Sequence, residues 1–133
     1  MPSTIDILIP AVNNAYFTRS LINSIKKHTT ILYRIIYIDN GSEPDELDCV
    51  LQALKGTNYL VIENEQNLGF VKAINQGLKA STAEYICFQN NDTIVFKSYF
   101  EKSIAHLQKY NNAGIISPIA SQGGGKQGIE IIR

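Results

Sequence analysis

The sequence predicts an α/β fold: a doubly wound, mainly parallel, Rossmann-like sheet flanked by helices. Its 133 residues suffice for one hydrophobic core, and 44% of them are hydrophobic, as in a globular domain. Short, continuously apolar runs alternate with segments whose apolar residues recur at helical spacing. Continuous apolar runs are typical of parallel strands covered on both faces, and strands that alternate with helices favour right-handed crossovers around one sheet.

Five short apolar runs are predicted as buried strands, and helices are expected between them. The strands are residues 5–10 (IDILIP), 35–39 (IIYID), 59–63 (YLVIE), 85–89 (YICFQ) and 114–117 (GIIS). The helices carry Phe17, Leu21, Ile22 and Ile25, then Leu47, Val50, Leu51 and Leu54, then Phe70, Ala73, Ile74 and Leu78, then Tyr99, Ile104 and Leu107. Ser42, followed by Pro44 and Asp45, predicts the start of the second helix.

Charge and composition exclude several classes of function. Twelve basic residues balance twelve acidic ones, which argues against a nucleic-acid-binding protein because such proteins need a basic surface. No apolar run approaches the roughly 20 residues of a bilayer span, and residues 1–4 lack the basic start of a signal peptide. We therefore expect a cytoplasmic protein, or one at the inner face of the membrane. Cys49 and Cys87 lack CxxC spacing and a nearby histidine, which predicts free structural thiols.

Polar residues follow three of the predicted strands at the point where each strand ends. The three clusters are residues 10–14 (PAVNN), 39–42 (DNGS) and 89–93 (QNNDT). In a doubly wound sheet the ligand cleft lies beyond the carboxyl ends of the strands, so we expect these clusters to meet at one edge. Turn and helix-cap chemistry accounts for any one cluster. Several amide and carboxylate groups at the same rim favour a ligand site instead.

The third strand leads into residues 64–69 (NEQNLG) and then into a predicted helix. Gly69 gives the backbone freedom just ahead of the free N–H groups of that helix, and such a helix start attracts anions such as a diphosphate. Asp92, from the cluster after the fourth strand, is an acid suited to holding a divalent cation against the same phosphates.

Taken in order, these blocks resemble the nucleotide-sugar half of family 2 glycosyltransferases, which have the GT-A fold. The blocks are Pro10-Ala11-Val12-Asn13, Ile38-Asp39-Asn40-Gly41-Ser42, Asn67-Leu68-Gly69-Phe70 with Ala73-x-Asn75-x-Gly77, and Glu84-Tyr85 leading to Asn90-Asn91-Asp92-Thr93. The resemblance covers residues 5–118 of a single domain 1–133. It implies that residues 119–133 are a loop and the start of a missing acceptor half.

The resemblance divides a nucleoside diphosphate sugar among the matching residues. It places the base and ribose at Pro10, Ala11, Val12, Asn13, Asp39 and Asn40, and leaves open whether Asp39 or Asn40 makes the base contact. Val12 departs from the family, which usually has an aromatic residue there. Asn67, Gly69 and Asn75 are implied to lie near the donor or under its loop, with bracing of the turn as the alternative for Asn75.

Asn90, Asn91 and Asp92 stand where the family carries its DxD metal motif. The resemblance implies a Mg²⁺ or Mn²⁺ ion held by Asp92 and Asn90, with Asn90 and Asn91 also near the donor. Both ions favour oxygen ligands, and the metal neutralises the departing diphosphate. Because Asn90 replaces the first acid of the motif, one negative charge is lost, and we expect modest metal affinity in the absence of donor.

The implied activity is metal-assisted, inverting transfer of the sugar to a glycan, lipid-linked or protein acceptor, as in polysaccharide biosynthesis. The family's general base lies in its acceptor half, and no residue up to Arg133 takes that role, since Glu130 comes too early. A nucleotide-binding module without turnover therefore stays open as the alternative. A sheet cut at this point also predicts self-association through its edge.

Other motifs in the sequence do not indicate a different class of protein. Residues 123–128 (GGGKQG) lack the order of a phosphate-binding P-loop and indicate a flexible loop, and no GxGxxG follows the first strand as a dehydrogenase would require. A receiver domain needs an acidic pair, a phosphoacceptor aspartate and a later lysine, a set that is not apparent. His28 and His106 have no ligand partners at suitable spacing and are expected to be surface or capping residues.

Overall fold

The computed structural model describes residues 4–118 of the chain, which divides into two compact units, residues 1–101 and 102–133. The elements are β1 (Ile5–Ala11), α1 (Ala15–His28), β2 (Tyr33–Asp39), α2 (Pro44–Leu54), β3 (Tyr59–Glu63), α3 (Phe70–Ala80), β4 (Tyr85–Phe88) and α4 (Tyr99–Gln108). None of the helices in the described part is long and apolar enough to cross a membrane. The predictions for residues 119–133, including Glu130, lie outside the described residues.

The first unit is built on one four-stranded parallel sheet with the order β3-β2-β1-β4. In the register of the sheet, Ile7 of β1 lies opposite Ile35 of β2 on one side and Cys87 of β4 on the other. Each strand is followed by a helix along the chain, and helices cover both faces. The predicted doubly wound α/β fold is therefore confirmed.

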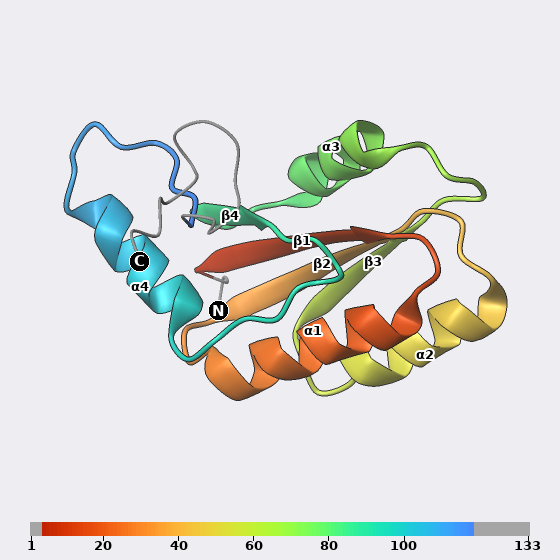
Figure 1. Cartoon of the computed structure of the whole chain (residues 1–133). Coiled ribbons are helices and arrows are strands. Elements are labelled where there is room, and N and C mark those ends of the chain that lie inside the picture. Colours follow the sequence, from red (N-terminus) through yellow and green to blue (C-terminus); the bar gives the residue numbers. More distant parts are fainter. Residues whose placement is uncertain (1–3, 119–133) are drawn as a thin grey trace, which may run out of the picture. The chain divides into compact units, whose positions relative to one another are not determined.

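The two faces of the sheet carry different helices (Figure 1). On one face, α3 packs on the central strands, where Leu8, Ile36 and Ile38 form a buried cluster with Ala73 and Ile74 of α3. Because successive strand residues point to opposite faces, Ile7, Ile9, Ile35 and Tyr37 point to the other face, where α1 and α2 lie. All four are fully buried, as are Leu21, Ile22 and Ile25 of α1.

Three sequence predictions need correction. Burial on both faces holds for the central strands β1 and β2 but is wrong for β3 and β4, which lie at the two edges and are partly exposed. Residues 114–117 form no strand and are exposed, with Ile115 91% exposed. A strand needs a neighbour to pair its N–H and C=O groups, and in the described residues this run has none. Finally, Ser42 does not cap α2, whose N-cap is Glu43.

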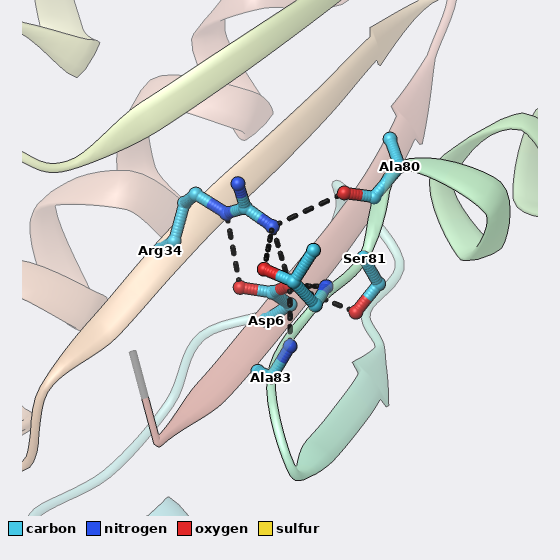
Figure 2. A network of polar contacts seen from close by, with 6 residues as sticks. Asp6, Arg34, Ala80, Ser81 and Ala83 are labelled. Carbon is cyan, nitrogen blue, oxygen red and sulfur yellow. Dashed lines mark hydrogen bonds and ion pairs between the residues drawn. The ribbon is translucent and has the colours of Figure 1, made fainter. Parts of the chain in front are cut away.

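A polar network ties the sheet together at the edge where the strands begin (Figure 2). Asp6 is fully buried, and its carboxylate accepts two hydrogen bonds from Arg34, at 3.1 Å from Nε and 2.7 Å from Nη2. It also accepts from the Ser81 hydroxyl at 2.8 Å and from the N–H groups of Thr82 and Ala83. Its charge is thus paired inside the core. The network fixes β1, β2 and the α3–β4 connection to one another.

Candidate functional site

The loops that follow β1 and β2 are linked to each other by hydrogen bonds at the carboxyl edge of the sheet. The Asn13 N–H donates to the Ser42 hydroxyl oxygen at 2.7 Å, and the Glu43 N–H donates to Asn13 Oδ1 at 2.9 Å. In addition, the Ala15 N–H at the start of α1 donates to a Glu46 carboxylate oxygen at 2.6 Å. The clusters after the first two strands therefore form one structure, as the topology predicted.

Asp39 lies at the end of β2 with 3% of its surface exposed. Its carboxylate accepts the Ser42 N–H at 3.2 Å and is 3.5 Å from the Tyr37 hydroxyl. Burial, followed by the charge of Asp39, raises the pKa of Tyr37 well above its ordinary value, so the phenol remains a proton donor toward this carboxylate. Asp39 is a buried acid held in place from two sides.

Asn40 is the centre of a second network, which holds the loop after β3. Its Nδ2 donates to Asn67 Oδ1 at 2.9 Å, while its Oδ1 accepts the Leu68 N–H at 3.1 Å and an Asn64 N–H at 3.2 Å. Its own backbone N–H donates to the Ala11 carbonyl at 2.8 Å. The Asn40 side chain, 5% exposed, is therefore committed to the loop.

The same loop is braced from α3 and from the β2 tip. Asn64 and Gln76 exchange two amide hydrogen bonds, both 2.8 Å long. Gly41, at φ +85°, lies so close to the loop that a Cβ there would be 2.8 Å from Gln66 Cα. Gly69, at φ +82°, is the N-cap of α3, and no side chain makes a capping hydrogen bond there. First-turn N–H groups have no partner within a helix, so this start keeps donors for an anion.

The cluster after β4 is attached to α1. Asn91 Nδ2 donates to the Thr18 hydroxyl at 3.1 Å, and the Thr93 hydroxyl donates to the Asn90 carbonyl at 2.6 Å. The Gln89 N–H donates to the Leu8 carbonyl, which places this turn directly after the paired part of β4. Asn90 and Asp92 are both exposed, so their side chains are open to a ligand.

The metal-ligating groups at this turn suit an ion that is bound jointly by the protein and a diphosphate, rather than one enclosed by protein side chains alone. Among the described residues, no group of three or more His, Cys, Asp and Glu side chains could enclose an ion. Asp92 supplies one exposed carboxylate, and Asn90 adds an amide oxygen. Mg²⁺ commonly binds through one or two carboxylates together with substrate phosphates and water, so these residues fit an ion that the diphosphate helps to hold.

The structure brings some of the predicted site residues together and leaves others apart. Pro10 and Ala11 lie inside β1, and Val12 is half-buried in the turn after it. Asn67 Oδ1 accepts the N–H of Gly69 in addition to that of Asn40, so Asn67 holds its own loop. Asn75 is exposed on α3, and its neighbour Gln76 makes the brace that we considered for Asn75. The contacts of all these residues with a donor stay predictions.

Sequence reasoning missed Glu46, Asn64 and Gln76 as parts of the site. Glu46 is 31 residues from the N–H that it accepts, and the Asn64–Gln76 pair depends on how α3 turns relative to the loop. No spacing in the sequence signals either contact. The expected free thiols are found: Cys49 is exposed, while burial raises the pKa of Cys87 to about 11 and makes it a poor nucleophile.

This arrangement is that of a GT-A domain, and the chain belongs to glycosyl transferase family 2, whose sequence profile matches residues 6–131. An uncharacterised glycosyltransferase of Haemophilus influenzae is 29% identical over 110 residues, which cover 79% of this chain and 33% of that protein. Glycosyltransferase GlyG of Streptococcus pneumoniae is 24% identical over 110 residues, or 82% of this chain and 36% of GlyG. The chain thus spans well under half of the length of these relatives.

Solved structures share the fold at low sequence identity. S. aureus TarS 1–349 in complex with UDP-GlcNAc superposes with a TM-score of 0.73 at 20% identity, over 90% of this chain and 38% of TarS 1–349. The mannosyltransferase PcManGT of Pyrobaculum calidifontis, in complex with GDP-Man and Mn²⁺, gives a TM-score of 0.72 at 13% identity, over 92% of this chain and 36% of PcManGT.

Proposed function

We propose that this chain binds a nucleoside diphosphate sugar for an inverting, metal-assisted glycosyltransferase. The observation that carries the proposal is that hydrogen bonds join the loops after β1, β2 and β3 at the carboxyl edge of the sheet, while the turn after β4 is attached to α1. A buried acid, Asp39, is the last residue of β2, and an exposed acid, Asp92, lies in the turn after β4. Asp39 is suited to accept a hydrogen bond from the base, and Asp92 is suited to bind a cation beside the diphosphate. The nucleotide-sugar complexes of TarS and PcManGT support this class of ligand.

We assign the base contact to Asp39 rather than to Asn40. The amide of Asn40 already donates to Asn67 and accepts from Leu68 and Asn64, so it has little capacity left for a ligand. The carboxylate of Asp39 has lone pairs beyond its contacts with Ser42 and Tyr37. A carboxylate oxygen accepts the imino N–H of a uracil, thymine or guanine base.

The diphosphate lies, in this proposal, between the start of α3 and Asp92. The N–H groups after Gly69 attract phosphate oxygens, and Asp92 with Asn90 would hold the divalent ion. When bound, the ion supplies Lewis-acid stabilisation of the charge on the leaving diphosphate. The residues of this chain bind and orient the donor. A glycan, lipid-linked or protein acceptor and a role in polysaccharide biosynthesis complete the proposal.

Thermal unfolding with UDP, dTDP and GDP, each with and without Mn²⁺, tests the function. A nucleotide present at about 100 times its dissociation constant should stabilise the chain by roughly 2.7 kcal/mol. At least one nucleotide should raise the melting temperature, and Mn²⁺ should increase that shift. If no nucleotide changes the melting temperature at millimolar concentration, the proposal is wrong. Release of sugar from the matching donor would separate the transferase from a binding module without turnover.

Replacing Asp92 by alanine tests the metal assignment. We expect Asp92→Ala to abolish the additional shift that Mn²⁺ gives, because the carboxylate that we assign to the ion is removed. Metal-free nucleotide binding should persist, because the base contact at Asp39 is untouched. Asp48→Ala, which removes another exposed acid, in α2, is the matched control and should keep the Mn²⁺ effect. A Mn²⁺-dependent shift that survives in Asp92→Ala contradicts the assignment.

A further inference from the structure

We propose that Glu46 and Ser42 are positioning residues for the nucleoside end of the donor. They hold residues 13–15 in a strained conformation next to Asp39, so that the base-binding surface exists before the nucleotide arrives. This inference rests on the proposed nucleotide-binding function and goes further, because it gives a role in binding to residues outside the predicted contact set.

The first argument is that the starts of α1 and α2 stabilise each other. α1 has no acidic residue in its first turn, and its N-cap Asn14 makes no side-chain capping bond. The Ala15 N–H instead donates a hydrogen bond to Glu46 Oε2 in α2, with an N···O distance of 2.6 Å. In return Asn13 Oδ1 accepts the Glu43 N–H at the start of α2. A carboxylate bond to a helix-start N–H is charge-assisted and therefore stronger than a neutral hydrogen bond.

The second argument is backbone strain. Asn13 and Asn14 have φ values of +52° and +57°, so two consecutive non-glycine residues are left-handed. A non-glycine residue in this region is strained and persists only where surrounding contacts enforce the conformation. The enforcing contacts here are those from Ser42 and Glu46, one on each side of the strained pair.

The third argument is that the strained segment is tied to the proposed base-binding acid. Ser42 uses both of its polar groups for this: its hydroxyl oxygen accepts the Asn13 N–H, and its own N–H donates to Asp39 Oδ2. Ser42 thus links Asn13 to Asp39, because it makes one hydrogen bond with each of them. When Glu46 or Ser42 is lost, the segment relaxes and only part of the population keeps the binding geometry. Apparent affinity falls in proportion to that fraction.

The test compares Glu46→Ala and Ser42→Ala with Glu46→Gln and Asp48→Ala in the full 133-residue chain. The nucleotide is whichever of UDP, dTDP and GDP binds the unaltered chain most tightly, and inorganic pyrophosphate with Mn²⁺ is the base-free comparison. Titration calorimetry gives the dissociation constants, and ¹H–¹⁵N spectra follow the Ala15 amide. Glutamine keeps an oxygen that can accept this N–H, whereas Asp48→Ala removes an exposed acid of the same helix.

We expect Glu46→Ala and Ser42→Ala to weaken nucleotide binding about tenfold, corresponding to a competent fraction of roughly one in ten. Pyrophosphate binding should be unchanged, Glu46→Gln should restore most of the affinity, and the Ala15 amide signal should move in Glu46→Ala and return in Glu46→Gln. Asp48→Ala should behave as the unaltered chain.

Two results overturn the inference: nucleotide affinity unchanged in Glu46→Ala and Ser42→Ala, or equal weakening of nucleotide and pyrophosphate, which would indicate general loss of structure. Failure of the unaltered chain to bind any of the three nucleotides would instead remove the proposed function, and the inference with it.

Discussion

Asn40 shows why an amide, and not an acid, follows Asp39 in this chain. One side chain must donate to Asn67 Oδ1 and accept from both Leu68 and Asn64. A carboxylate has no hydrogen to donate, and an aliphatic side chain would leave the partners unpaired. Two neighbouring residues of similar size thus have separate tasks: Asn40 organises the loop, while Asp39 is the residue that we propose for the ligand.

Asn40→Asp should therefore destabilise the fold. The new carboxylate would face the Asn67 oxygen without a proton between them, and a lost hydrogen bond in a buried site costs about 1–3 kcal/mol. Urea unfolding at pH 7 measures the change in the free energy of unfolding. Asn75→Asp makes the same chemical change at an exposed position on α3 and should leave stability nearly unaltered. Equal stability of the two variants would show that the Asn40 donor is dispensable.

At the scale of elements, α3 can approach the sheet closely because Gly77 has no side chain. A Cβ at this position would be 2.8 Å from two atoms of the Leu8 side chain and 3.1 Å from Ile38 Cδ1. Both neighbours are fully buried, so they have little room to move. This close packing fixes the start of the helix that is proposed to meet the diphosphate.

Gly77→Ala should lower the free energy of unfolding despite the better helix propensity of alanine. Overpacking a core costs about 1–3 kcal/mol, whereas the propensity gain is at most about 1 kcal/mol. In a Leu8→Ala background the added methyl group finds space, so the same substitution should cost less or become stabilising. A double-mutant cycle by urea unfolding measures this coupling. Additive effects would contradict the steric explanation.

The turn between α1 and β2 is held by a carboxylate from α4. Glu101 accepts the N–H and the hydroxyl of Thr30 and the N–H of Ile31. Burial raises the pKa of Glu101, but the hydrogen bonds, first among them that from the Thr30 N–H, outweigh it, and the pKa lies below its ordinary value of 4.5. The contribution of this carboxylate to stability is therefore complete above that value and is lost as the pH falls through the lowered pKa.

Comparing the unaltered chain with Glu101→Gln isolates this effect from the other acids. The difference in the free energy of unfolding between the two proteins should be constant from pH 7 to about pH 5 and should shrink toward pH 3. Urea unfolding across this range measures it. A difference that stays constant to pH 3 would show that Glu101 does not titrate with a lowered pKa in the folded chain.

At the scale of the whole molecule, the sequence predicted the order of strands and helices along the chain better than it predicted which of their faces are exposed. The apolar runs identified β1 and β2 correctly because these strands are central, but the exposure of β4 depends on strand order, which a run such as YICF does not contain. The meeting of the strand tips followed from the geometry of parallel sheets. The bonds between them did not, because they depend on the left-handed pair Asn13 and Asn14 and on Glu46.

β4 is also where we expect the chain to associate with a second copy of itself. In the first unit β4 is an edge strand, and in the register of the sheet Ile86 and Phe88 share the face of Asp6 and Leu8. These two side chains are 42% and 57% exposed. An edge strand that also exposes apolar side chains is a template for pairing with another chain.

Sedimentation velocity at increasing protein concentration should therefore reveal a dimer. Phe88→Ser should weaken it by about tenfold or more, because burial of an aromatic side chain contributes roughly 1.5–3 kcal/mol. Phe96→Ser is the matched control, since Phe96 is 76% exposed in the segment between β4 and α4 and not on the strand. A monomer at every concentration, or equal weakening by both substitutions, would refute association through β4.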